Sequence, residues 1–293
     1  MIIVVTGPTG VGKTKLSVSL AKKYNAEIIN GDAVQVYKGL DIGSAKVTEE
    51  EKDGIVHHLF DIRDVWEEYS IFDYQSDCRK SIDEIISRGK NVVIVGGTGL
   101  YIKSALYDYT LNKEEVMDNQ YEGVETSELY ERLKELDKDI DIDKNNRRRV
   151  IRALNYFLTF NKSIKENSDG NKLLYDCLFI GLTTDRDILY DRINKRVDVM
   201  VENGLLEEVK LFYDRDMRYK PLLGGIGYKE LFNYYDNDIT LEEAIDLIKR
   251  NSRRYAKRQY TFFNNQFNIK WFDVNFDDFD KTILEVCNYI DNK

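Results

Sequence analysis

The octapeptide Gly7-Pro8-Thr9-Gly10-Val11-Gly12-Lys13-Thr14 constrains the fold of this chain more than any other feature. It matches the pattern G-x-x-x-x-G-K-T and follows a β-branched apolar run, Ile2–Thr6, which is typical of a buried parallel strand. A helical spacing of apolar residues over positions 13–24 comes directly after it. Glycines let the backbone fold back so that N–H groups at the start of a helix point at phosphate oxygens. The sequence therefore predicts a phosphate-binding loop between a strand and a helix.

Strand and helix patterns alternate along most of the chain. Further strands are predicted over residues 26–30, 91–96, 175–182 and 269–272, and further helices over residues 72–88, 241–265 and 281–289 and from Leu100 onward. Such alternation predicts an α/β fold, namely a P-loop NTPase-like parallel sheet that is flanked by helices.

One segment breaks this alternation. Residues 107–145 are polar and acid-rich, and they show helical periodicity only over 129–136. We expect a small helical insert domain there. It would separate the first part of the core, residues 1–106, from the remainder of the core with the C-terminal helices, residues 146–293.

The last two residues of the octapeptide carry its chemistry. Lys13 would supply a positive charge to the terminal phosphates, and Thr14 would offer a hydroxyl to a phosphate-bound Mg²⁺ ion. An ordinary P-loop ATPase also places an Asp at the end of a neighbouring strand to hold the metal. Here the strand over 92–95 runs into Gly96-Gly97-Thr98, which contains no acid. This favours a phosphate cradle for a small substrate over a motor or switch NTPase.

Two polar residues follow predicted strands and should meet the loop at the same edge of the sheet. Asp32 comes after the strand over 26–30, and Thr98 comes after the strand over 91–96. The Asp32 carboxylate is a candidate general base, but the composition Asn30-Gly31-Asp32 fits a structural turn equally well. Thr98 could hydrogen-bond a phosphate oxygen, and taken alone it is better explained as a helix N-cap.

Net charge and charge placement favour different partners. The chain has 43 Lys and Arg residues against 52 Asp and Glu residues, and the resulting formal charge of -9 by itself argues against nucleic acid. Two segments without acids, residues 144–152 and 249–258, nevertheless hold 11 of the basic residues. A polyanionic partner and a solvated helix face explain these segments about equally well.

Composition argues against several other classes of protein. Cys78, Cys177 and Cys287 lie far apart, so neither a zinc site nor a disulfide framework is indicated. The adjacent pair His57 and His58 would point in different directions on a helix or a strand, which favours packing roles over metal binding. No apolar run reaches the length of a membrane span, and the N-terminus has no signal-peptide pattern. We expect a cytoplasmic protein without a membrane partner.

Seven sequence blocks, in order, resemble the tRNA dimethylallyltransferase family, also called tRNA isopentenyltransferases or IPP transferases. The blocks are the octapeptide and residues 32–46 (DAVQVYKGLDIGSAK), 57–62 (HHLFDI), 96–101 (GGTGLY), 149–154 (RVIRAL), 227–230 (GYKE) and 255–261 (YAKRQYT). The resemblance extends from the first strand to about Phe272. Seven blocks in the same order are far more specific than any one of them.

The resemblance implies an enzyme that transfers a dimethylallyl group from dimethylallyl diphosphate to N6 of adenosine 37, just 3′ of the anticodon of tRNA. Asp32 matches the family's general base, and Thr98 matches a threonine near the bridging diphosphate oxygen. Arg196 matches a group that holds the diphosphate together with Lys13, Thr14 and Mg²⁺. The whole octapeptide is implied to bind the diphosphate or a nucleotide such as ATP.

The family also implies a set of tRNA contacts and a monomeric enzyme that binds the anticodon stem-loop. The implied tRNA-binding residues are Asp32, Ala33, Val34, Gln35, Arg148, Arg149, Val150, Ile151, Arg152, Lys257 and Arg258. Ala33 replaces the family's usual Ser, and Phe262 replaces a common Trp. Residues 145–147 (NNR) and 223–226 (LGGI) also depart from the usual pattern. These departures concern tRNA contacts more than the reaction.

Three other functions would explain some of these sequence features. A small-molecule kinase would also use the loop and Asp32, but it would not explain the basic segments. An enzyme that prenylates free AMP, ADP or ATP would need neither the insert nor the C-terminal basic helix. An RNA-binding P-loop switch would not need the Asp32 carboxylate for its function.

Overall fold

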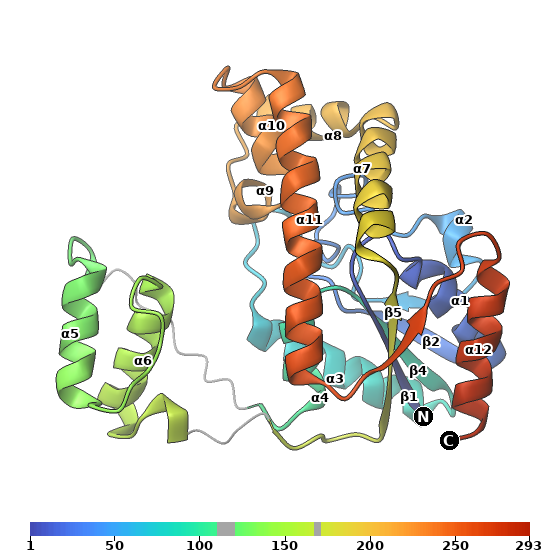
Figure 1. The fold of residues 1–293 in the computed structure, drawn as a ribbon, viewed down its shortest axis with the longest axis horizontal. Helices are drawn as coiled ribbons and strands as arrows, with labels where there is room; N and C mark the ends of the chain where they lie inside the picture. Colours follow the sequence, from blue (N-terminus) through green and yellow to red (C-terminus); the bar gives the residue numbers. More distant parts are fainter. Residues whose placement is uncertain (110–120, 167–170) are drawn as a thin grey trace. The chain divides into compact units, whose positions relative to one another are not determined.

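The computed structural model describes residues 1–109, 121–166 and 171–293. Its centre is a parallel sheet of six strands in the order β3-β2-β4-β1-β5-β6 (Figure 1). The strands are β1 (Ile2–Thr6), β2 (Ala26–Asn30), β3 (His57–His58), β4 (Asn91–Val95), β5 (Cys177–Thr183) and β6 (Lys270–Asp273). Since β1 lies between β4 and β5, the octapeptide leaves the sheet near its middle. The predicted α/β class is confirmed.

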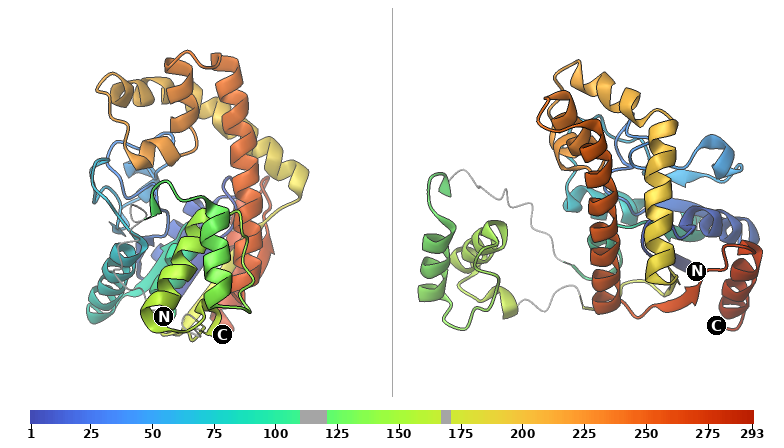
Figure 2. Two further views of the ribbon diagram at one scale, coloured as in Figure 1. Left: turned by 90° about the vertical axis from the view of Figure 1, so that its left-hand side faces the viewer. Right: turned by 45° about the horizontal axis from the view of Figure 1, so that its top comes forward.

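Helices connect and flank the strands. They are α1 (Lys13–Lys23), α2 (Glu49–Lys52), α3 (Ile71–Ser87), α4 (Gly99–Leu106), α7 (Arg186–Glu202), α8 (Leu205–Tyr213), α9 (Lys220–Gly224), α10 (Tyr228–Tyr235), α11 (Leu241–Gln266) and α12 (Phe279–Asp291). Helix α11 begins with a capping box, because Thr240 and Glu243 each accept a hydrogen bond from the other's backbone N–H. It lies beside α7 (Figure 2), to which an ion pair between Lys249 and Asp198 (2.6 Å) ties it.

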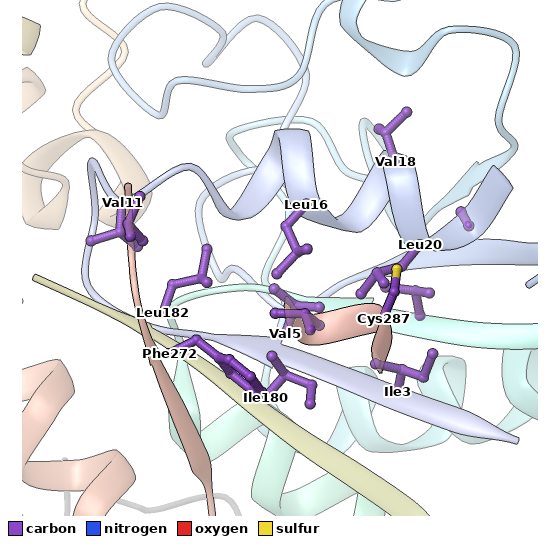
Figure 3. Close-up of a cluster of buried hydrophobic side chains, with 14 of the residues drawn as sticks. Ile3, Val5, Val11, Leu16, Val18, Leu20, Ile180, Leu182, Phe272 and Cys287 are labelled. Carbon is purple, nitrogen blue, oxygen red and sulfur yellow. The ribbon is translucent and has the colours of Figure 1, made fainter. Parts of the chain in front are cut away.

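The core follows the period-two alternation of side chains along the strands. Ile3 and Val5 of β1 belong to a buried cluster with residues of α1 and α12 (Figure 3). Ile2 and Val4 point to the opposite face of the sheet and are also buried. Because both faces are covered, the central strands consist almost entirely of apolar residues, which is why their positions could be predicted.

The chain divides into two compact units. One contains residues 1–106 and 174–293, and the other contains Tyr107–Leu173. In the second unit, α5 (Thr126–Leu136) and α6 (Arg147–Phe160) share one hydrophobic cluster, and a short 3₁₀ helix (Ile164–Glu166) follows. This second unit includes α6 and extends to Leu173, past residue 145, where we expected the insert to end. The reason is that the buried face of α6 completes the small core that α5 begins.

Most predicted elements of the sheet-containing unit agree with the observed ones to within two residues. β3 had no counterpart among the predicted strands, because its two residues, His57 and His58, are too few to show a period. They pair with Ile28 and Ile29 of β2. In the described parts of the chain, no helix combines the length and the apolar character that crossing a membrane requires.

Candidate active site

A pocket of about 450 Å³ lies at the carboxyl ends of β1, β2 and β4. Parallel strands end at the same edge of a sheet, so the loops that follow them converge there. Asp32, Thr98 and Arg196 of α7 all line this pocket. The octapeptide residues that line it are Thr9, Gly10, Lys13 and Thr14.

Glycine is required at two positions of the octapeptide loop. Gly7 has φ 136° and Gly12 has φ 92°, both in the region that disfavours other residues. A Cβ atom on Gly7 would lie 2.5 Å from the carbonyl oxygen of Leu182, and one on Gly12 would lie 2.6 Å from the ring of Phe279. Pro8 and Val11, which the resemblance assigned to the binding loop, are buried. The Val11 side chain belongs to the hydrophobic cluster of Figure 3 and anchors the loop to the core.

Lys13 lies in the pocket, and the groups that accept its hydrogen bonds are uncharged. Its Nζ donates hydrogen bonds to the carbonyl oxygens of Gly7 (3.0 Å) and Pro8 (2.7 Å). Burial and the positive charge of Arg196 lower the pKa of Lys13 to about 7, against the opposing effect of Asp32. An anion bound in the loop would supply the missing negative charge and raise this pKa again.

Asp32 is held in a tight turn by a buried asparagine. The Asp32 N–H donates to Asn30 Oδ1 (2.8 Å), and Asn30 Nδ2 donates to the carbonyl oxygens of Asp32 (3.0 Å) and Leu59 (3.0 Å). Asp32 Oδ1 in turn accepts the N–H of Val34 (2.9 Å). Asp32 is therefore both a turn residue and a pocket carboxylate. Asn30 was not predicted as a site residue, although a polar residue that ends a buried strand is a usable signal.

The charges in the pocket act on one another. Burial raises the pKa of Asp32 above its usual value, although the N–H of Val34 and the positive charges of Lys13 and Arg196 oppose this rise. Burial lowers the pKa of the Arg196 guanidinium, and Asp32 opposes that change. A carboxylate with a raised pKa is a better proton acceptor than an exposed one, provided that it is ionised.

Thr98 faces the Asp32 turn. Its Oγ1 accepts a hydrogen bond from the N–H of Ala33 (3.0 Å), and its own N–H donates to the carbonyl oxygen of Gly31 (3.0 Å). Thr98 directly precedes α4 and so occupies its N-cap position. The N–H that its side-chain oxygen accepts belongs, however, to Ala33, which is not part of that helix. Because the oxygen is the acceptor in the hydrogen bond from Ala33, the O–H of Thr98 can be the donor in a hydrogen bond to a ligand oxygen.

Another wall of the pocket comes from the loop that contains residues 43–45. Glu208 of α8 accepts hydrogen bonds from the backbone N–H groups of residues 41–43 (2.7–3.0 Å) and from the hydroxyl of Tyr228 (2.6 Å). Gln35, a predicted tRNA contact, lines the pocket, and its Nε2 donates to the carbonyl oxygen of Ser44 (3.0 Å). Sequence reasoning missed Glu208, because it lies outside the seven blocks and acts on a distant loop.

The pocket fits Mg²⁺ only as an ion that is shared with a bound anion. Thr14 supplies one hydroxyl, and within the described ranges there is no group of three His, Cys, Asp or Glu residues that could hold a metal. Mg²⁺ commonly takes one or two protein ligands and completes its shell with substrate phosphates and water. The donor set therefore suits a metal that arrives with a diphosphate.

The basic segment of α11 divides into two parts. Arg250, Arg254, Lys257 and Arg258 are exposed, and Arg258 also lines the pocket. Arg253 instead donates a hydrogen bond to Asn194 of α7. The exposed part is the part that is available to a polyanion.

In the second unit, the predicted tRNA-binding residues of α6 also divide into two groups. Arg148, Arg149 and Arg152 are exposed. Val150 and Ile151 are fully buried in the cluster that α6 shares with α5. Their side chains therefore form part of the small core of this unit, because a helix with an exposed charged side must bury its other side to fold.

Comparison with known proteins settles the family. A family model described as IPP transferase matches residues 35–266, well over half of the chain. The chain belongs to the IPP transferase family. Among curated relatives, the tRNA dimethylallyltransferase of Anoxybacillus flavithermus is 48% identical over 100% of this chain and 96% of its own length. That of Bacillus subtilis is 49% identical over 93% of this chain and 90% of its own length.

Solved structures of IPP transferases agree with the fold. The crystal structure of a tRNA isopentenylpyrophosphate transferase from Bacillus halodurans is 45% identical, with a TM-score of 0.77 over 99% of this chain and 95% of that chain. A eukaryotic dimethylallyltransferase described as acting on tRNA is 30% identical, with a TM-score of 0.87 over 100% of this chain and 80% of that chain.

Proposed function

We propose that this IPP transferase moves a dimethylallyl group from dimethylallyl diphosphate to N6 of adenosine 37 of tRNA, and releases diphosphate. The observation that carries the proposal is the pocket itself. The glycine-rich loop with Lys13 and the Asp32 carboxyl, whose pKa is raised, line one cavity, which supports a reaction between an amine and a diphosphate ester. Relatives that carry the name of this activity are 48–49% identical to the chain.

The reaction assigns a separate role to each side of the pocket. The N6 lone pair of adenine forms a bond to C1 of the dimethylallyl group, while the C1–O bond breaks and its electrons go to the diphosphate. Asp32 accepts the proton that N6 loses. Lys13, Arg196 and the loop N–H groups stabilise the negative charge that develops on the leaving diphosphate. The Thr98 hydroxyl donates a hydrogen bond to the oxygen that joins C1 to the diphosphate.

Mg²⁺ would be held by Thr14 together with the diphosphate oxygens, and it would neutralise part of the leaving group's charge. The adenosine must leave the stacked anticodon loop to reach a pocket at the sheet edge, so the enzyme also has to hold the surrounding RNA. Gln35, Arg258 and the exposed arginines of α6 are the proposed tRNA contacts. We further propose a monomer in the cytoplasm, where the three free thiols of the chain would stay reduced.

The decisive test is incubation with dimethylallyl diphosphate and either tRNA or free AMP, ADP or ATP, followed by mass analysis of nucleosides. We expect prenylated adenosine in the tRNA and none in the free nucleotides. Prenylated AMP with unmodified tRNA would identify an enzyme for free nucleotides instead. Phosphate transfer from ATP to a small molecule would identify a kinase.

Charge reversal of the exposed part of α11 should weaken tRNA binding. For Arg254, Lys257 and Arg258 replaced together by Glu, we expect an affinity loss of about 10- to 100-fold, because phosphate contacts are lost and counterions are no longer released. The slope of log affinity against log salt should fall by about 2. Filter binding or fluorescence anisotropy with an anticodon stem-loop, over a series of salt concentrations, measures both quantities.

The matched control replaces three exposed lysines on other helices, Lys22, Lys80 and Lys281, by Glu and produces the same change in net charge. An equal loss of affinity in the control would show that only net charge matters. That result would remove α11 from the RNA-binding surface.

A further inference from the structure

Gln259 joins two loops of the pocket through one side-chain amide. Its Oε1 accepts a hydrogen bond from the N–H of Thr9 (3.2 Å), and its Nε2 donates to the carbonyl oxygen of Gly97 (3.0 Å). Thr9 belongs to the phosphate-binding loop after β1, whereas Gly97 belongs to the turn after β4. Gln259 itself comes from α11, 250 residues away from Thr9, and only 5% of it is exposed.

The fit around this amide is close. A Cβ atom on Gly97 would lie 2.1 Å from Gln259 Nε2 and 3.7 Å from Asp32 Oδ2, so both the amide and the carboxylate lie close to Gly97. Tyr255, one helical turn earlier on α11, reaches the same Gly97 carbonyl oxygen with its hydroxyl (3.4 Å). Thr9 offers a donor and Gly97 an acceptor, and the glutamine amide presents the matching acceptor and donor without needing to be protonated.

The two loops hold different parts of the reaction. The phosphate-binding loop holds the diphosphate, whereas the turn continues into Thr98, which in turn accepts the N–H of Ala33 beside Asp32. The separation of the two loops therefore determines how far the base lies from the leaving group. Displacements of about 1 Å between reacting groups can cost 10²-fold in rate.

We propose that Gln259 is a positioning residue, whose amide fixes the phosphate-binding loop relative to the turn that carries Thr98. Gln259 lines the pocket, and the role that we assign to it is exerted through its hydrogen bonds to Thr9 and Gly97. This inference rests on the proposed function, because it concerns the alignment of that function's two substrates. A purely structural role for a buried glutamine would instead predict lower stability with normal turnover for each folded molecule.

Two variants separate these roles. Gln259→Met keeps the length of the side chain and removes both hydrogen bonds. Gln259→Glu keeps the acceptor for Thr9 but can donate to the Gly97 carbonyl only while its carboxyl is protonated. The matched control is Gln266→Met on the same helix, where the native amide oxygen accepts from Lys103 (2.6 Å), far along the helix from both loops.

Single-turnover prenylation at saturating substrates, normalised to the folded fraction, is the first readout. For Gln259→Met we expect a rate about 10- to 100-fold below wild type with an unchanged KM for tRNA. For Gln259→Glu, the rate relative to wild type should rise as the pH falls from about 8 to 6, because burial raises the pKa of a carboxyl and its proton restores the missing donor. The Gln266→Met control should match wild type.

Binding of inorganic pyrophosphate, measured by calorimetry, is the second readout and does not depend on turnover. It should be about five- to tenfold weaker in Gln259→Met, because the loop loses the hydrogen bond at Thr9. Wild-type enzyme that forms no prenylated tRNA would refute the proposed function, and pyrophosphate binding would then decide the role of Gln259. Unchanged pyrophosphate affinity, or variant rates within twofold of wild type with a flat pH ratio, would overturn the inference.

Discussion

We expect the Asp32→Asn variant to lose turnover by about 10²- to 10⁴-fold while it still binds tRNA and pyrophosphate. The amide oxygen can still accept the N–H of Val34, so the turn should persist. What the variant lacks is a group that can take the proton from N6 of the adenosine. Single-turnover formation of prenylated tRNA, with separate binding assays for each substrate, measures the effect.

The pKa of Asp32 also predicts the direction in which the rate changes with pH. Burial raises the pKa of Asp32, so the wild-type rate should fall as the pH drops through that raised pKa, where the carboxyl becomes protonated. This acid limb should be absent from the residual activity of Asp32→Asn. Asp214→Asn, at an exposed carboxylate paired with Lys210, is the control and should behave as wild type. Full turnover in Asp32→Asn would show that another group accepts the N6 proton, and would overturn the role of Asp32 as the base.

The second large effect is expected at Lys13. Replacement by Met should lower kcat/KM for dimethylallyl diphosphate by about 10²- to 10³-fold, because an electrostatic stabiliser of the leaving group is removed from a buried site. Tight binding of tRNA should be retained, since Lys13 faces the phosphate-binding loop. Steady-state kinetics with each substrate varied in turn separates the two effects.

Lys13 should also produce an alkaline limb in the pH profile of kcat/KM for dimethylallyl diphosphate. Its pKa is lowered to about 7, so kcat/KM for the diphosphate should fall as the pH rises through about 7 and the ammonium loses its proton. At saturating diphosphate the bound anion raises this pKa, which moves the limb in kcat to higher pH. Lys13→Met should show no such limb, whereas Lys22→Met, an exposed position on the same helix, should keep it. An alkaline limb that survives in Lys13→Met would belong to another group.

Much of the pocket could be predicted because its signals are local. The apolar run of β1, the glycines of the octapeptide and the helical period of α1 lie within about twenty consecutive residues. Asp32 and Thr98 each follow a recognisable strand, and the parallel sheet brings their loops to one edge. The family resemblance added Arg196, which no period or spacing had singled out.

Sequence patterns could not distinguish the exposed residues of a helix from the buried ones where both lie in one of the seven sequence blocks. Val150 and Ile151 lie in the same six-residue block as Arg149 and Arg152, yet they are buried under α5. The same packing places α6 in the second unit rather than in the core. Both outcomes depend on which surface the helix meets, and that surface comes from another segment of the chain.

By itself, the sequence determined the strand, loop and helix order that creates a phosphate-binding edge, because periodicity and the need for glycine act over a few neighbouring residues. Only the tertiary structure decided how that edge is held and charged. Gln259 reaches Thr9 across 250 residues, Glu208 holds a loop that begins at Asp41, and Arg196 helps to lower the pKa of Lys13. Such contacts depend on three-dimensional distance and on burial, and neither is set by the spacing of residues along the chain.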